Sequence, residues 1–227
     1  MNDFYKIQNK NGVDIAVGNK LLIDGKAGKL EVCTHMGLSN ISNLPDNPDI
    51  LIMCHPHPLY QGTMDNKVVT SVISAFTKEG ALSVRFNFRG VGKSEGDHDK
   101  GIGESEDVIS VYNWVKSCFP KSKIILGGFS FGAYVAYRAK DSLYIEKLIL
   151  LAPAVRFENN MPSLPEPKVP VLIVMGDADE VIPPDDILDW VRSLSCSYNL
   201  VKLNGVSHFF HHNLSSLKSI IKSYYLY

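Results

Sequence analysis

Near the middle of the chain stands Gly128-Phe129-Ser130-Phe131-Gly132, a G-x-S-x-G pattern. An apolar run, Lys123–Leu126, precedes it and predicts a strand, and Ala133–Lys140 continues with a helical pattern. A serine held on so tight a turn needs neighbours without Cβ, because strand and helix backbones approach closely there. The helix N-terminus favours negative charge developing at the serine. The context predicts a nucleophile at Ser130, against the competing interpretation of a glycine-rich turn with an incidental serine.

Outward from this turn, short apolar runs alternate with longer amphipathic runs, which is typical of βαβ units and an α/β fold with a mostly parallel central sheet. We expect helices on both faces, because the central runs are apolar almost throughout. The expected strands are Ile50–Cys54, Ala81–Phe88, Lys123–Leu126, Leu148–Leu151 and Val169–Met175. The expected helices are Asn66–Lys78, Glu104–Cys118, Phe131–Lys140, Pro184–Ser193 and Asn213–Tyr225.

Two further segments bear on the architecture. Lys20–Ile23 and Leu30–Thr34 lie among glycines and predict antiparallel hairpins at a sheet edge. Pro153–Lys168 contains Pro153, Pro162, Pro165 and Pro167, which predict an extended surface loop. That span is too short for a folded lid, so we expect no cap domain and a single domain over residues 1–227.

A serine hydroxyl is a weak nucleophile without a base, and in a site of this kind the acid and the histidine follow the serine along the chain. His208 stands after the strand-like Leu200–Leu203 and before the last helix, where a loop can reach Ser130. His211 and His212 compete for the role, and each is more simply interpreted as solvated or capping. The sequence predicts His208 as the base.

The acid should come from Met175–Pro183, which follows a predicted strand and offers three carboxylates. Asp177 lies next to Gly176, the ordinary place for a side chain that closes a turn. Asp179 lies two residues farther out and is the predicted acid, while Glu180 is expected to be solvated. Asp177 stays open as the alternative.

An oxyanion requires two preorganised N–H donors, one from the residue after the nucleophile, here Phe131. The second should come from the loop at 54–60, where Pro56 and Pro58 have no N–H to give. The His57 amide is the leading donor and Leu59 the alternative. His55 is expected to hold the loop through side-chain hydrogen bonds.

Composition narrows the class of partner. Lys+Arg (23) and Asp+Glu (24) nearly cancel, so charge indicates no nucleic acid or membrane partner. The four cysteines form no CxxC pattern, and neither a secretory signal nor an apolar span is found, which together favour the cytoplasm. We expect a small-molecule acyl substrate, with a homodimer as one possible assembly.

A metal site would need His55, His57, His208, His211 or His212 together with the aspartates. Alternate residues of a strand point to opposite faces, and no H-E-x-x-H pattern is present, so neither a metal nor a cofactor is predicted.

Three stretches carry a resemblance to a known family: Cys54–Tyr60 with Thr63–Lys67, Arg85–Ser94, and Gly127–Gly132. Between about Ile50 and Phe210 the chain resembles the α/β-hydrolase superfamily, and within it a bacterial group of lidless serine hydrolases related to dienelactone hydrolases. The resemblance implies a triad of Ser130, Asp179 and His208, an oxyanion hole of loop and elbow amides, and esterase-type chemistry. Dienelactone hydrolases carry a cysteine where this chain has Ser130, and relatives mostly have glycine where it has Gln61.

The residues and the resemblance predict a carboxylesterase-like serine hydrolase that forms an acyl-enzyme in an open, shallow cleft shaped by the His55–Gly62 loop, the elbow, Phe209 and Phe210. A peptidase, thioesterase or acyltransferase with the same triad, or a binding module that retains the fold without turnover, stays open as the alternative.

Overall fold

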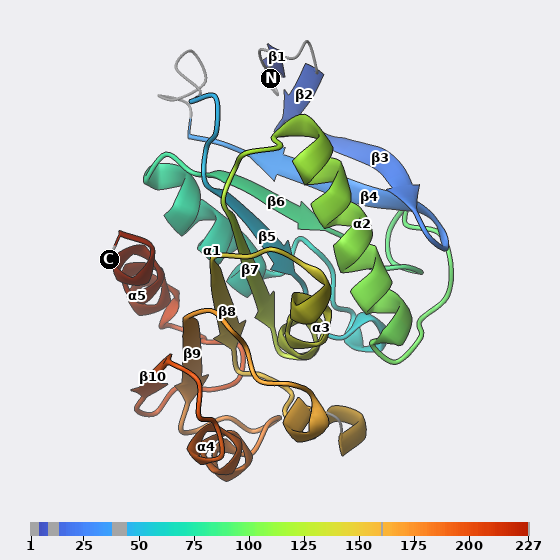
Figure 1. The fold of residues 1–227 in the computed structure, drawn as a ribbon. Helices are drawn as coiled ribbons and strands as arrows, with labels where there is room; N and C mark the ends of the chain where they lie inside the picture. The colour runs from blue at the N-terminus through green and yellow to red at the C-terminus, as the bar shows by residue number, and fades with distance from the viewer. Residues whose placement is uncertain (1–4, 9–13, 38–44, 160, 227) are drawn as a thin grey trace.

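The computed structural model describes residues 5–8, 14–37, 45–159 and 161–226. Within them ten strands form one sheet in the order β1-β2-β4-β6-β5-β7-β8-β9-β10, with β3 paired to β4 (Figure 1). The strands are β1 (Tyr5–Gln8), β2 (Asp14–Val17), β3 (Lys20–Gly25), β4 (Gly28–His35), β5 (Ile50–Cys54), β6 (Leu82–Phe86), β7 (Ile124–Phe129), β8 (Lys147–Leu151), β9 (Val171–Gly176) and β10 (Tyr198–Leu203).

The sheet is parallel where the sequence predicted it to be. From β6 through β5, β7, β8 and β9 to β10, each neighbouring pair runs parallel. The β3–β4 hairpin is antiparallel and joins this core through an antiparallel β4–β6 pair. The mostly parallel α/β sheet and its antiparallel edge are therefore confirmed.

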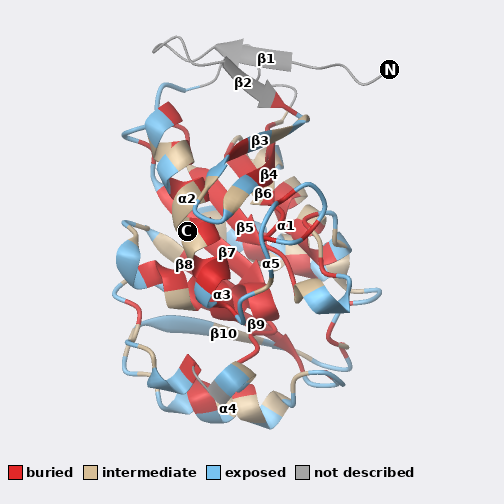
Figure 2. Ribbon diagram, turned by 90° about the vertical axis from the view of Figure 1, so that its right-hand side faces the viewer, coloured by how far each residue is buried: buried red, intermediate tan, exposed pale blue. Residues whose placement is uncertain are grey.

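Helices cover both faces of the sheet (Figure 1). They are α1 (Lys67–Lys78), α2 (Ile102–Cys118), α3 (Phe131–Ala139), α4 (Pro184–Arg192) and α5 (Leu214–Leu226). Core residues of α2, α3 and α4 pack with Ile50 and Ile52 on one face, whereas those of α1 and α5 pack with Leu51 and Met53 on the other. This alternation along β5 is the two-residue period of a strand buried on both sides, and Figure 2 shows the central strands buried.

Strand β7 is longer than the sequence predicted, since it continues through Gly127 and Gly128 to Phe129. Gly127 and Gly128 interrupt the apolar run, but both pair with β5 and β8. A Cβ on Gly127 would lie 2.9 Å from the Met53 sulfur, so the glycine here permits close packing. The strand consequently runs directly into Ser130.

The segment from Pro153 to Lys168 is not the extended surface loop that its prolines predicted. It contains two single-turn 3-10 helices, Phe157–Asn159 and Met161–Ser163, and Met161 is fully buried. The apolar residues between the prolines pack onto the core, so the segment lies against it. In the described part of this segment no longer helix occurs, so nothing of lid size stands here.

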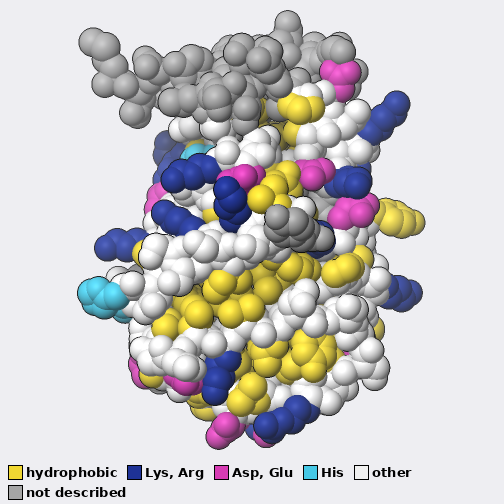
Figure 3. All heavy atoms as spheres, turned by 90° about the vertical axis from the view of Figure 1, so that its left-hand side faces the viewer, with side chains coloured by type: hydrophobic (Ala, Val, Ile, Leu, Met, Phe, Trp, Pro, Cys, Tyr) yellow, Lys and Arg dark blue, Asp and Glu magenta, His cyan; other side chains and the backbone are white. Residues whose placement is uncertain are grey.

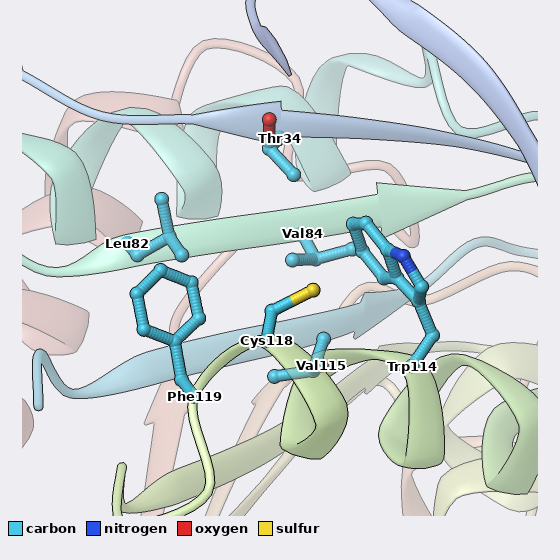
Figure 4. Close-up of a pocket in the computed structure, with 7 residues that line it drawn as sticks. All are labelled: Thr34, Leu82, Val84, Trp114, Val115, Cys118 and Phe119. Atoms are coloured by element: carbon cyan, nitrogen blue, oxygen red, sulfur yellow. The ribbon is translucent and has the colours of Figure 1, made fainter. Parts of the chain in front are cut away.

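Two apolar hollows lie away from Ser130. One, about 10 Å³, is enclosed between α2 and the sheet by side chains that include Val84, Trp114 and Cys118 (Figure 4). The surface that faces this space is apolar and offers a water molecule no hydrogen-bond partners, so the space is a packing defect. The other is a groove beside α5 that Leu172, Val201 and Tyr224 help to line, on the side of the molecule where Figure 3 shows hydrophobic patches. Among the described helices, none has the length and apolarity needed to cross a membrane.

Candidate active site

Ser130 lies on a strained turn between β7 and α3. Its backbone has φ 56° and ψ −117°, a conformation that L-residues rarely adopt. A Cβ on Gly128 would lie 2.1 Å from the Gly132 oxygen, and one on Gly132 would lie 2.4 Å from the His55 oxygen. Neither contact is possible, so both glycines are required for this turn. The structure thus has the strand, tight turn and helix that the pattern predicted.

Three side chains from distant parts of the sequence form one hydrogen-bonded chain. The Ser130 Oγ lies 3.0 Å from His208 Nε2, and His208 Nδ1 lies 2.8 Å from Asp179 Oδ2. Each residue follows the carboxyl end of a parallel strand, β7 for Ser130, β9 for Asp179 and β10 for His208, so the fold brings them to one edge of the sheet. All three are buried, with His208 only 2% exposed.

The two aspartates of the 175–183 turn have different contacts. The second carboxylate oxygen of Asp179 accepts the backbone N–H groups of Val181 at 2.9 Å and Ile182 at 2.8 Å, which orients it toward His208. Asp177 instead accepts the N–H of Gly205 at 2.6 Å and closes the turns that follow β9 and β10. Of the two, Asp179 is the one hydrogen-bonded to His208.

Glu180 has a contact that the sequence did not indicate. The side chain is exposed, as expected, and its Oε2 also accepts the backbone N–H of His208 at 3.1 Å. The turn after β9 therefore holds both the ring and the main chain of this histidine. No local pattern could have revealed the contact, because 28 residues separate the partners.

Two backbone amides near Ser130 are free to donate. Within the described residues no acceptor is found for the N–H of Phe131 or of His57. The alternative donor, Leu59, gives its N–H to His57 Nδ1 at 3.2 Å. With the Leu59 N–H used in this bond, the His57 amide is the available donor of the loop. Because His57 Nδ1 accepts the bond, the proton of the neutral His57 ring lies on Nε2.

His55 supports this loop from inside, as expected. Its Nε2 accepts the Phe88 N–H at 3.0 Å, and its Nδ1 lies 2.6 Å from the Pro56 oxygen, to which it donates. Burial lowers the pKa of His55 to about 4, so the ring is neutral near pH 7. At the end of the loop, Gln61 has φ 61°, a left-handed conformation that favours glycine.

The remaining candidates lie elsewhere. His211 and His212 are exposed, and no group of three or more His, Cys, Asp or Glu side chains in the described ranges is arranged to hold a metal ion. Phe210 was expected at the cleft, but it is fully buried in the core with α1 and α5. Phe209, 38% exposed, keeps the outward position.

The chain is similar to several known proteins. A family model described as serine aminopeptidase S33 matches residues 63–168, which contain Ser130 but neither Asp179 nor His208. An uncharacterised protein of Rickettsia prowazekii is 34% identical over 188 residues, which are 78% of this chain and 79% of that protein.

Solved structures resemble the whole fold. An α/β serine hydrolase homologue from Coxiella burnetii is 40% identical, with TM-score 0.86, and the match covers 92% of this chain and 98% of that one. A serine hydrolase without a lid from Xanthomonas campestris is 36% identical, with TM-score 0.83 and coverage of 90% and 92%. A dienelactone hydrolase from Anabaena variabilis shares the fold at 16% identity and TM-score 0.76. The chain therefore belongs to the α/β-hydrolase superfamily, among its serine hydrolases.

Proposed function

We propose that this protein cleaves ester-like bonds of a small substrate, with Ser130 as nucleophile, His208 as base and Asp179 as the acid that orients it. The observation that carries the proposal is the buried chain of hydrogen bonds from Ser130 Oγ through His208 to Asp179. A serine, a base and an orienting carboxylate in this relation form an activated nucleophile.

The mechanism follows from the contacts. Ser130 Oγ attacks the acyl carbonyl while its proton passes to His208 Nε2, and Asp179 stabilises the imidazolium through Nδ1–H. The Phe131 and His57 amides donate to the oxyanion, supported by the positive end of α3. The leaving alcohol takes the proton from His208. Water, deprotonated by His208, then attacks the acyl-enzyme and releases the acid, which restores Ser130.

The test combines a covalent probe with turnover. The wild-type protein should react with a fluorophosphonate and hydrolyse p-nitrophenyl acetate, and Ser130→Ala should do neither. Chelation with EDTA should leave the rate unchanged, because no step uses a metal. An unreactive wild type, with Ser130→Ala behaving identically, would disprove the proposal. Loss of activity on chelation with recovery on adding a divalent ion would transfer the chemistry to a metal.

A peptidase is the second candidate, because the matching family model is described as a serine aminopeptidase. The same side chains can attack an amide. Parallel assays with oxygen esters, thioesters, lactones and L-aminoacyl p-nitroanilides would separate these chemistries by kcat/KM. A ligand that raises the Tm of wild type and Ser130→Ala equally, with no product, would instead favour a binding module.

The proposed setting is the cytoplasm and the proposed partner a small molecule. All four cysteines are free thiols, and three of them are buried, which fits a reducing compartment.

A further inference from the structure

We propose that the acyl side of this site takes an aromatic acyl group and that Phe157 is the residue that selects it. The inference rests on the proposed function and names its substrate class: esters of aromatic carboxylic acids. It is carried by a cluster of rings beside the amides that would bind the oxyanion.

The cluster is centred on His57, Phe131 and Phe157. The His57 ring lies 4.7 Å from that of Phe131 and 5.4 Å from that of Phe157, and Phe131 and Phe157 lie 5.2 Å apart, centroid to centroid. The two free backbone amides near Ser130 are those of the same His57 and Phe131. A substrate carbonyl bound by those amides therefore has its neighbouring substituent close to these rings.

The rings around Ser130 form two separate sets. The second set surrounds His208, where Phe129 and Phe209 each lie 5.0 Å from its ring. Within the described residues no ring contact joins this set to the His57 cluster. Because His208 must protonate the leaving oxygen, the leaving group lies on this side, where Phe209 is exposed and Phe129 is fully buried. The His57 cluster on the other side is left for the acyl group.

Part of the cluster is available to a ligand. Phe131 is buried beneath it, whereas His57 and Phe157 are half-buried and Tyr60, 4.9 Å from His57, is 83% exposed. The contacts of Phe157 with His57 and Phe131 are edge-on, with interplanar angles of 67° and 80°. Aromatic rings favour such edge-to-face contacts at 4.5–7 Å, so a further ring can extend the cluster.

Phe157 is held in position from both sides. Arg156 Nε lies 2.6 Å from Asp186 Oδ1 in α4, and Lys100 Nζ lies 3.8 Å from Glu158 Oε1. The residues on either side of Phe157 are thus paired with α4 and with the loop before α2. In the proposal, Phe157 forms one wall of the acyl site, held mainly by its ring contacts with His57 and Phe131.

The experiment compares two esters that differ only in the acyl ring, p-nitrophenyl benzoate and p-nitrophenyl cyclohexanecarboxylate. We divide the kcat/KM of each ester by its rate constant for hydrolysis by hydroxide. On this scale the wild-type protein should favour the benzoate. Phe157→Leu should lower this benzoate preference about fivefold, which corresponds to the free energy of one aromatic pair. Phe157→Tyr keeps the ring and should retain the preference. Tyr60→Leu, at an 83% exposed position, should lower the preference in the same direction and provides a variant that leaves the buried core unchanged.

Phe209→Leu is the matched control, because its ring lies on the His208 side. It should leave the benzoate preference as in wild type. The inference is overturned if neither Phe157→Leu nor Tyr60→Leu changes the preference, or if Phe209→Leu changes it equally. Fluorophosphonate labelling and p-nitrophenyl acetate turnover, measured on the same samples, separate this outcome from failure of the proposed function, in which both would be absent.

Discussion

At the scale of single residues, the two aspartates of the 175–183 turn have contacts that predict opposite effects. Asp179→Asn should lower kcat by about 10³–10⁴-fold, because an amide cannot hold the imidazolium or enforce the Nδ1–H tautomer. Asp177→Asn should act chiefly on stability, since its contact is with the Gly205 amide. Kinetics with p-nitrophenyl acetate and urea unfolding of both variants check the assignment, and the reverse ranking would transfer the role to Asp177.

Glu180 provides the second test at this scale, because it accepts the main-chain N–H of the proposed base. Glu180→Ala should lower kcat roughly tenfold through a misplaced His208, with KM for a short ester little changed. Glu180→Gln keeps an acceptor oxygen and should recover most of the rate. If the alanine and glutamine variants lose activity equally, the hydrogen bond does not position His208.

At the scale of elements, the segment from Pro153 to Lys168 decides what can cover the site. Its described part has two single turns, and its buried Met161 and half-buried Phe157 fold it onto the molecule. A lid needs two helices of about 10–12 residues with their connections, for which this length of chain does not suffice.

The absence of a lid-sized insertion predicts a preference for short or compact acyl groups and no interfacial activation, because nothing in this segment can enclose a long chain. Rates across p-nitrophenyl esters from acetate to palmitate should therefore fall with chain length. A maximum at long chains, or a jump in rate above the solubility limit of the substrate, would contradict this prediction.

At the scale of the whole molecule, the buried His55 and the half-buried His35 make the free energy of unfolding depend on pH. Burial lowers the pKa of His55 and of His35 to about 4, from 6.5. Since the folded state disfavours protonation, their contribution to stability is fully present above pH 6.5 and is lost as the pH falls toward 4, by roughly 3 kcal/mol for His55. Urea unfolding at pH 7.5, 6 and 5 should show this loss.

His35→Gln is the control, because the Gln oxygen can still accept from Arg85 Nε, which now donates to His35 Nε2 at 2.8 Å. The variant should lose less stability between pH 7.5 and 5 than wild type. An unchanged loss would mean that His35 takes no part in the acid destabilisation. The expected homodimer stays a prediction at this scale, to be measured by light scattering.

Local patterns predicted the sheet, the helices and the position of Ser130 because each depends on neighbours in the sequence. Apolar runs mark strands buried on both faces, and the glycines around Ser130 mark a turn where no Cβ fits. The same patterns were wrong where packing over a distance decided. Gly127 and Gly128 interrupt the apolar run but continue the strand, and the prolines after 153 do not prevent compact turns.

The residues near Ser130 were enough to predict its strand, turn and helix, because the conformation of a tight turn is set by residues within a few positions of it. The sequence also limited the acid to a single turn of the chain and the base to three histidines. The tertiary structure was needed to show that Asp179 rather than Asp177 contacts His208, that Glu180 accepts from the main chain of His208 and that Phe157 packs against His57. Each of these joins residues 28 or more positions apart, and such contacts depend on where the ends of parallel strands meet.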